Sequence, residues 1–134
     1  MSSQLSHGRE GLGCPRVLLA EDHDATREAL KMLLELNGYE VFAARDGEEA
    51  LRIARQTWPD VVITDFDMPN LDGVGLTRQL RAISSQMRHP AILIITAVSR
   101  SMVERALEAG VDAYIAKPID FKILEATLRT LVEH

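Results

Sequence analysis

The chain has 134 residues, of which 46% are hydrophobic and 26% are charged, and its formal net charge is −5. This length allows one domain with its own hydrophobic core, and the acidic balance argues against a surface that coats nucleic acid. The one cysteine, Cys14, excludes an internal disulfide, and no cysteine–histidine cluster has the spacing of a zinc site. We expect a cytoplasmic protein, because the sequence has no signal-peptide-like segment and no apolar run long enough to span a membrane.

Short apolar runs alternate with amphipathic segments after a polar, glycine-rich stretch, residues 1–15, which we expect to be a flexible extension. Continuous apolar runs are typical of strands buried on both faces, whereas apolar residues at helical spacing predict helices. A strand regularly followed by a helix indicates a parallel sheet with right-handed crossovers and helices on both faces. We expect strands at 16–20, 39–44, 61–65, 91–96 and 113–116, with helices that begin near residues 23, 46, 73, 99 and 120.

Helix ends are marked by capping residues and by helix breakers. A serine, Ser99 or Ser101, should cap the fourth helix, and Trp58 before a proline should end the second and fill a gap in the packing. On the third helix we expect Arg81 to lie on the solvated side with its neighbour Arg78. On the last helix we expect Ile123 to belong to the apolar face.

Polar side chains follow the carboxyl ends of the predicted strands, namely Glu21, Asp22, Asp65, Thr96 and Lys117. These ends share one edge of a parallel sheet, which is where open α/β sheets bind ligands. Clustered carboxylates repel each other unless a cation neutralises them, and Mg²⁺ suits such oxygen ligands. A carboxylate such as Asp65 can become an aspartyl-phosphate, with Lys117 offsetting phosphoryl charge. Taken alone, Asp65 could equally be a cap of the turn that follows it.

Four short motifs stand at these strand ends in a fixed order, namely Leu18–Asp22, Asp65–Pro69 with Leu71–Gly73, Ile94–Ala97 and Lys117–Pro118. Together they resemble the receiver domain of bacterial two-component response regulators, of which the chemotaxis regulator is one, over about residues 16–133. The resemblance implies a single α/β domain at 16–134, a flavodoxin-like (βα)5 three-layer sandwich with parallel sheet order 2-1-3-4-5.

The resemblance also assigns roles at the site. Asp65 would accept a phosphoryl group from the phosphohistidine of a sensor histidine kinase or a histidine phosphotransfer protein. Mg²⁺ would be bound by Asp22 and Asp65, by Glu21 mainly through water, and by the backbone carbonyl of Asp67. Lys117 would contact the phosphoryl group, and its peptide bond to the following proline would be cis. The side chain of Asp67 would tune the lifetime of the phosphorylated state.

In the same family the signal leaves the site through a hydroxyl and an aromatic ring. The resemblance assigns these roles to Thr96 and Tyr114, and it implies that a downstream protein or a second copy of the chain docks on residues 101–132. Such a domain catalyses only its own phosphorylation and dephosphorylation, and it contacts neither nucleic acid nor membrane directly. From the residues alone, Tyr114 is a half-buried strand residue and His23 is a surface residue at a helix start.

Other classes of protein fit the sequence less well. The pair Asp65 and Asp67 resembles the nucleophile and acid/base of haloacid-dehalogenase-like phosphatases, but that motif ends the first strand of its fold, and here it ends the third. A receiver-like binding module that works without phosphorylation would not need the complete set of acids and Lys117. A flavodoxin-like flavin site would need a phosphate-binding loop after the first strand, where Glu21 and Asp22 would repel the phosphate.

Overall fold

The computed structural model describes residues 13–83, 88–97 and 99–133. We expected a flexible extension at residues 1–15 and a loop at residues 84–89. Residues 1–12 of the extension and residues 84–87 of the loop lie outside the described ranges, as does residue 134. The elements, in chain order, are β2 (Arg16–Ala20), α1 (Asp24–Leu36), β3 (Glu40–Ala44), α2 (Gly47–Thr57), β4 (Val61–Asp65), α3 (Gly73–Ile83), β5 (Ala91–Thr96), α4 (Arg100–Ala109), β6 (Ala113–Ala116) and α5 (Phe121–Val132).

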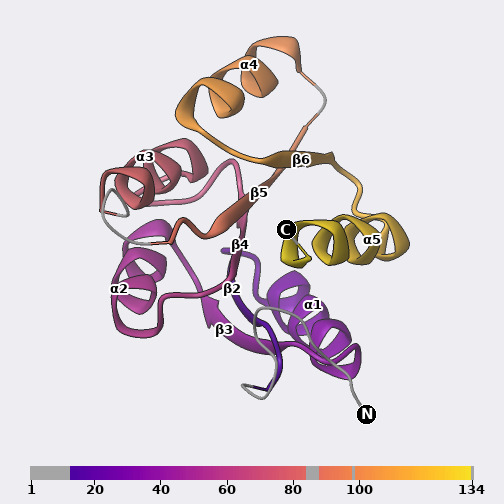
Figure 1. Ribbon diagram of the computed structural model, residues 1–134. Helices are drawn as coiled ribbons and strands as arrows, with labels where there is room; N and C mark the ends of the chain where they lie inside the picture. The colour runs from indigo at the N-terminus through magenta and orange to yellow at the C-terminus, as the bar shows by residue number, and fades with distance from the viewer. Residues whose placement is uncertain (1–12, 84–87, 98, 134) are drawn as a thin grey trace.

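The described strands form one parallel sheet in the order β3-β2-β4-β5-β6 (Figure 1). In chain order this is 2-1-3-4-5, so the predicted flavodoxin-like fold is confirmed. The middle strand, β4, is buried along its whole length, which agrees with its run of valine and isoleucine. This strand ends at Asp65, and the sequence therefore places a carboxylate at the centre of one sheet edge.

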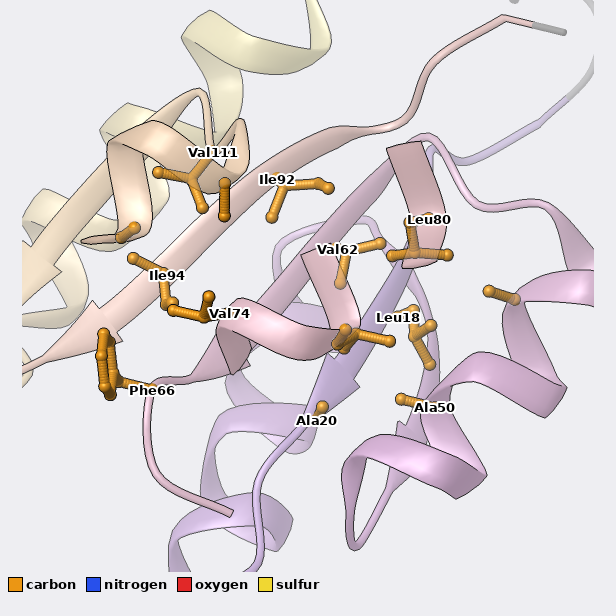
Figure 2. Close-up of a cluster of buried hydrophobic side chains, with 14 of the residues drawn as sticks. Leu18, Ala20, Ala50, Val62, Phe66, Val74, Leu80, Ile92, Ile94 and Val111 are labelled. Atoms are coloured by element: carbon orange, nitrogen blue, oxygen red, sulfur yellow. The ribbon is translucent and has the colours of Figure 1, made fainter. Parts of the chain in front are cut away.

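The helices form layers on both faces of the sheet because successive strand residues point to opposite faces. Leu18 lies in a core with residues of α2, α3 and α4, as Figure 2 shows. Its neighbour Leu19 lies in a second core with residues of α1 and α5. Burying one such leucine contributes about 1.5–3 kcal/mol. Both cores together fix the sheet edge that carries the candidate site.

Capping side chains begin the helices near the expected positions. Asp46, Ser99 and Asp120 each accept a hydrogen bond from a backbone N–H in the first turn of α2, α4 and α5. Of the two serines considered, the cap is Ser99. Trp58 ends α2 in the left-handed conformation, and its indole N–H donates to the carbonyl of Arg88.

Two side-chain expectations were wrong. Arg81 is not on the solvated side of α3, because its guanidinium donates to the carbonyl of Gly110 in the α4–β6 turn and to that of Pro90, just before β5. Ile123 is 55% exposed, whereas Leu124 and Leu128 are fully buried. One residue along a helix turns the side chain by about 100°, so Ile123 points away from the narrow face of α5 that meets the sheet.

Among the helices of the described residues, none combines the length and the hydropathy that a membrane span requires.

Candidate functional site

The strand ends bring the predicted residues together at one edge of the sheet. The backbone N–H of Glu21 donates to the carbonyl of Ala44 on β3, at 3.0 Å, and that of Lys117 donates to the carbonyl of Thr96 on β5, at 2.9 Å. These bonds extend the sheet by one residue past β2 and β6. A pocket of about 410 Å³ opens there, lined by Glu21, Asp22, His23, Thr26, Asp65, Lys117, Pro118 and Ile119.

Three carboxylates share this pocket. One oxygen from each of Glu21, Asp22 and Asp65 lies within 4.8 Å of the others. Asp22 is exposed, whereas Glu21 and Asp65 are each only 4% exposed. Burial raises the pKa of Glu21, against the hydrogen bond that its Oε2 accepts from the N–H of His23, and the neighbouring charges of Asp65 and Asp22 raise it further. Burial and mutual repulsion therefore destabilise the ionised forms of these carboxylates.

Lys117 supplies a positive charge in the pocket. Its Nζ lies 3.0 Å from Oδ1 of Asp65 and donates a hydrogen bond to Oδ2 at 3.1 Å. Burial lowers the pKa of Lys117, but the hydrogen bond and the charge of Asp65 outweigh burial, and the net shift is upward. Glu21 and Asp67 add to this upward shift. The lysine therefore stays charged beside the buried carboxylate.

The donor set fits a small, hard cation. Within the described residues, the buried Oδ1 of Asp65 accepts no hydrogen bond, although a charged nitrogen is near it. The Lys117 ammonium leaves hydrogen-bonding capacity of this buried oxygen unused, and a metal cation would use it. The oxygens of Glu21 and Asp22 lie beside it, and Mg²⁺ takes one or two carboxylates while it keeps several waters. The pocket can therefore bind a metal of this kind.

The turn between β2 and α1 is shaped by two residues next to the acids. His23 is the N-cap of α1, as expected of a helix-start residue, and its Nδ1 accepts from the N–H of Thr26 at 3.3 Å. Arg27, which the sequence reasoning missed, donates from Nη1 to the backbone carbonyl of Glu21 at 3.0 Å. The sequence offered one signal for this contact. Arg27 lies four residues after the cap His23, and residues at this spacing share one helix face, so Arg27 can reach back toward the start of the helix.

The two expected switch residues lie beside the site in different environments. Thr96 is buried, and its hydroxyl donates to the carbonyl of Ala97 at 3.1 Å. Tyr114 is 48% exposed. A hollow of about 330 Å³ lies between them and α4, with Val103 and Ser99 in its lining. The peptide between Lys117 and Pro118 is cis, as the resemblance implied.

Comparison with protein families finds a family model that matches most of the chain. The family model for the response regulator receiver domain matches residues 17–129. The chain is 41% identical over 119 residues to the response regulator MprA of Mycolicibacterium vanbaalenii, with 87% of this chain and 50% of that protein covered. The chain thus spans about half the length of the curated relatives that it matches.

Solved structures show the same likeness in three dimensions. The receiver domain of a signal transduction histidine kinase from Syntrophus aciditrophicus has a TM-score of 0.82 and 34% identity, over 89% of this chain and 90% of that one. The receiver domain of the sensor histidine kinase PA1611 from Pseudomonas aeruginosa has a TM-score of 0.80 and 29% identity, over 90% and 99%. The latter was solved with a magnesium ion coordinated in its active site cleft.

Proposed function

The chain belongs to the response regulator receiver domain family, and on this premise we propose that it is a signalling switch activated by phosphorylation of Asp65. Receiver domains of response regulators work with histidine kinases and are generally not metabolic enzymes. The phosphoryl donor is accordingly the phosphohistidine of a sensor kinase or of a histidine phosphotransfer protein. The observation that carries the proposal is the buried Asp65 carboxylate, with Lys117 at 3.0 Å and two further acids in reach.

Phosphoryl transfer to Asp65 makes one bond and breaks one. An oxygen of the carboxylate attacks phosphorus, the phosphorus–nitrogen bond of the phosphohistidine breaks, and its electron pair stays on the imidazole nitrogen. The ammonium of Lys117 lies where it can follow a phosphoryl oxygen as charge develops. Burial of Asp65 keeps water from surrounding the carboxylate, which strengthens this electrostatic contact.

We propose Mg²⁺ as the cofactor, held by Asp22, Asp65, the backbone carbonyl of Asp67 and, mainly through water, Glu21. The oxygen cluster and the buried Oδ1 of Asp65, which accepts no hydrogen bond within the described residues, support this assignment, as does the magnesium ion in the related PA1611 domain. When bound, the ion offsets negative charge on the phosphoryl group. The exposed side chain of Asp67 adds charge near the phosphate and tunes the lifetime of the phosphorylated state.

The signal leaves the site through Thr96 and Tyr114. Phosphate at Asp65 draws the Thr96 hydroxyl toward it by a charge-assisted hydrogen bond, and the Tyr114 ring moves into the hollow beside α4. The changed surface is residues 101–132, where a downstream protein or a second copy of the chain docks. We assign the domain to the cytoplasm, without direct contact to nucleic acid or membrane, which its net charge of −5 supports.

The alternative classes have less support. A haloacid-dehalogenase-like phosphatase is disfavoured by the family match and by the place of Asp65 at the end of the third strand in chain order. A receiver that binds partners without phosphorylation is disfavoured by the presence of Asp65, Asp22 and Lys117 in one pocket.

The proposed function is tested with a small-molecule phosphoryl donor. Intact-mass spectrometry after incubation with acetyl phosphate and Mg²⁺ should show one added phosphoryl group on the wild-type protein. Asp65→Asn should show none, whereas Asp67→Asn, which keeps the backbone carbonyl, should still be labelled. Full labelling of Asp65→Asn would contradict the assignment of the acceptor.

A further inference from the structure

The loop between β4 and α3, residues 66–72, rests against the N-terminus of α2. We propose that this contact sets the position of the Asp67 backbone carbonyl in the metal site, with Gly47 and Asn70 as the positioning residues. The inference rests on the proposed function and deepens it, since it concerns how the same site acquires its affinity for Mg²⁺.

Gly47 is the first residue of α2 and is buried. A Cβ atom at this position would lie 1.9 Å from the carbonyl oxygen of Leu71 and 2.7 Å from its carbonyl carbon. Both are backbone atoms, so no side-chain rotation can relieve the overlap. A side chain at position 47 would therefore push the loop away from α2.

The tip of the loop is bound by the same end of α2. Asn70 has a φ of 72°, and the N–H of Leu71 donates to the carbonyl of Pro69 at 2.8 Å, which together describe a γ-turn. A non-glycine residue in this conformation is strained and persists only where its surroundings hold it. The Asn70 amide donates from Nδ2 to Oδ2 of Asp46, the N-cap of α2, at 2.9 Å.

The base of the loop is fixed separately. The N–H of Gly73 donates to the carbonyl of Phe66 at 2.9 Å, and a Cβ atom on Gly73 would lie 2.4 Å from the carbonyl oxygen of Asp65. Asp67 stands between this base and the tip. Because both ends are held, a shift of the tip has to be absorbed by the peptide units between them, and the Asp67 carbonyl belongs to one of these units.

The test compares Mg²⁺ affinity in three variants and the wild type by NMR titration of the amide signals of residues 21–23. Gly47→Ala displaces the Leu71 backbone, and Asn70→Ala removes the tether to Asp46. Gly75→Ala is the matched control, since the nearest atoms to its Cβ belong to side chains, and the closest is Cδ1 of Leu71, the end of a flexible side chain, at 2.6 Å. We expect Gly47→Ala and Asn70→Ala to bind Mg²⁺ about tenfold more weakly, as is usual for residues that orient metal ligands. Gly75→Ala should match the wild type.

Thermal unfolding without Mg²⁺ separates positioning from a purely structural role, which would lower the midpoint and leave the affinity unchanged. Wild-type affinity in folded Gly47→Ala, or in Asn70→Ala if Gly47→Ala does not fold, would overturn this inference alone. A wild-type protein that binds no Mg²⁺ would overturn the proposed function as well. Equal weakening in Gly75→Ala would also overturn the inference, because the backbone contact at Gly47 would then have no specific effect.

Discussion

Lys117 and Asp65 stand 52 residues apart in the chain, yet the lysine Nζ lies 3.0 Å and 3.1 Å from the two carboxylate oxygens. The parallel sheet makes this contact possible, because β4 and β6 end at the same edge with only β5 between them. The ammonium partly neutralises the negative charge of the buried Asp65 carboxylate. Under the proposed function, we expect the ammonium to compete with Mg²⁺ for the carboxylate and to attract an incoming phosphoryl group.

Lys117→Met should separate these two effects. Without the ammonium, we expect Mg²⁺ to bind about fivefold more tightly, which corresponds to about 1 kcal/mol for an ion pair whose lysine is half-exposed. Phosphorylation by acetyl phosphate should become slower, because a charge that stabilises the transition state is lost. Calorimetric Mg²⁺ titration and labelling rates measure the two quantities. Weaker Mg²⁺ binding in the variant would show that the lysine does not compete with the ion.

Asp22→Ala should remove an exposed carboxylate that we propose as a metal ligand, and it should leave the fold intact. We expect Mg²⁺ affinity to fall at least about tenfold and phosphorylation to cease. Without Mg²⁺ the variant should unfold at the same temperature as the wild type or slightly higher, because one repelling charge has gone. Asp24→Ala is the control, since Arg27 already pairs with that carboxylate and holds its pKa below the usual range. Unchanged Mg²⁺ affinity in Asp22→Ala would contradict its role as a ligand.

The meeting of Asp65 with Lys117 could be predicted, because strand ends follow directly from the apolar runs and parallel strands share an edge. The sheet order could be predicted only from the resemblance to receiver domains. The contact of Gly47 with Leu71 could not be predicted, since it depends on how closely the N-terminus of α2 approaches the loop between β4 and α3. The same holds for Arg81, whose long side chain could reach solvent or the α4–β6 turn. In both cases tertiary packing decides between arrangements that the local sequence allows equally.

Arg81→Ala should be among the more destabilising changes of a partly exposed side chain. The guanidinium donates to Gly110, Pro90 and Asp112, and Oδ2 of Asp112 also accepts from the N–H of Ile92. Losing these contacts should lower the free energy of unfolding by about 2–3 kcal/mol, as is typical for bonds to a charged group. Urea denaturation measures the difference, with exposed Arg78→Ala as the control on the same helix. Equal urea midpoints for the two variants would refute the structural role.

Asp46 should make stability depend on pH in the acid range. As N-cap of α2 it accepts from the N–H of Glu49 at 2.8 Å, which lowers its pKa from the usual value near 3.8. A lowered pKa means that the ionised form stabilises the fold above about pH 4 and that this stabilisation is lost as pH falls through the folded pKa. Asp46→Ala should cost about 1 kcal/mol at pH 7.

The control for Asp46 is Asp46→Asn, which keeps a capping oxygen that does not titrate. Urea unfolding of the wild type, Asp46→Ala and Asp46→Asn at several pH values checks the sign. The advantage of the wild type over both variants should shrink as the solution becomes more acidic. An advantage that stays constant from pH 7 to below pH 3 would mean that the carboxylate charge does not contribute.

Thr96→Ala should separate phosphate uptake from signal output. The variant keeps Asp65, Lys117 and the acids, so we expect it to accept a phosphoryl group. Without the hydroxyl, no hydrogen bond can draw the end of β5 toward the phosphate. We therefore expect Tyr114 to keep its exposed position. In the wild type we expect the ring to move inward and lose exposed apolar surface, at about 25 cal/mol per Å². This movement should couple phosphate to ring position by about 1–3 kcal/mol.

The measurement compares amide chemical shifts with and without beryllofluoride, a phosphate mimic, in the wild type, Thr96→Ala and Thr96→Ser. We expect residues 101–132 to shift in the wild type and in Thr96→Ser, which keeps the hydroxyl, and to respond much less in Thr96→Ala. Equal shifts in all three proteins would show that Thr96 does not carry the signal. If residues 101–132 do not shift in the wild type, the surface that changes on phosphorylation lies elsewhere on the domain.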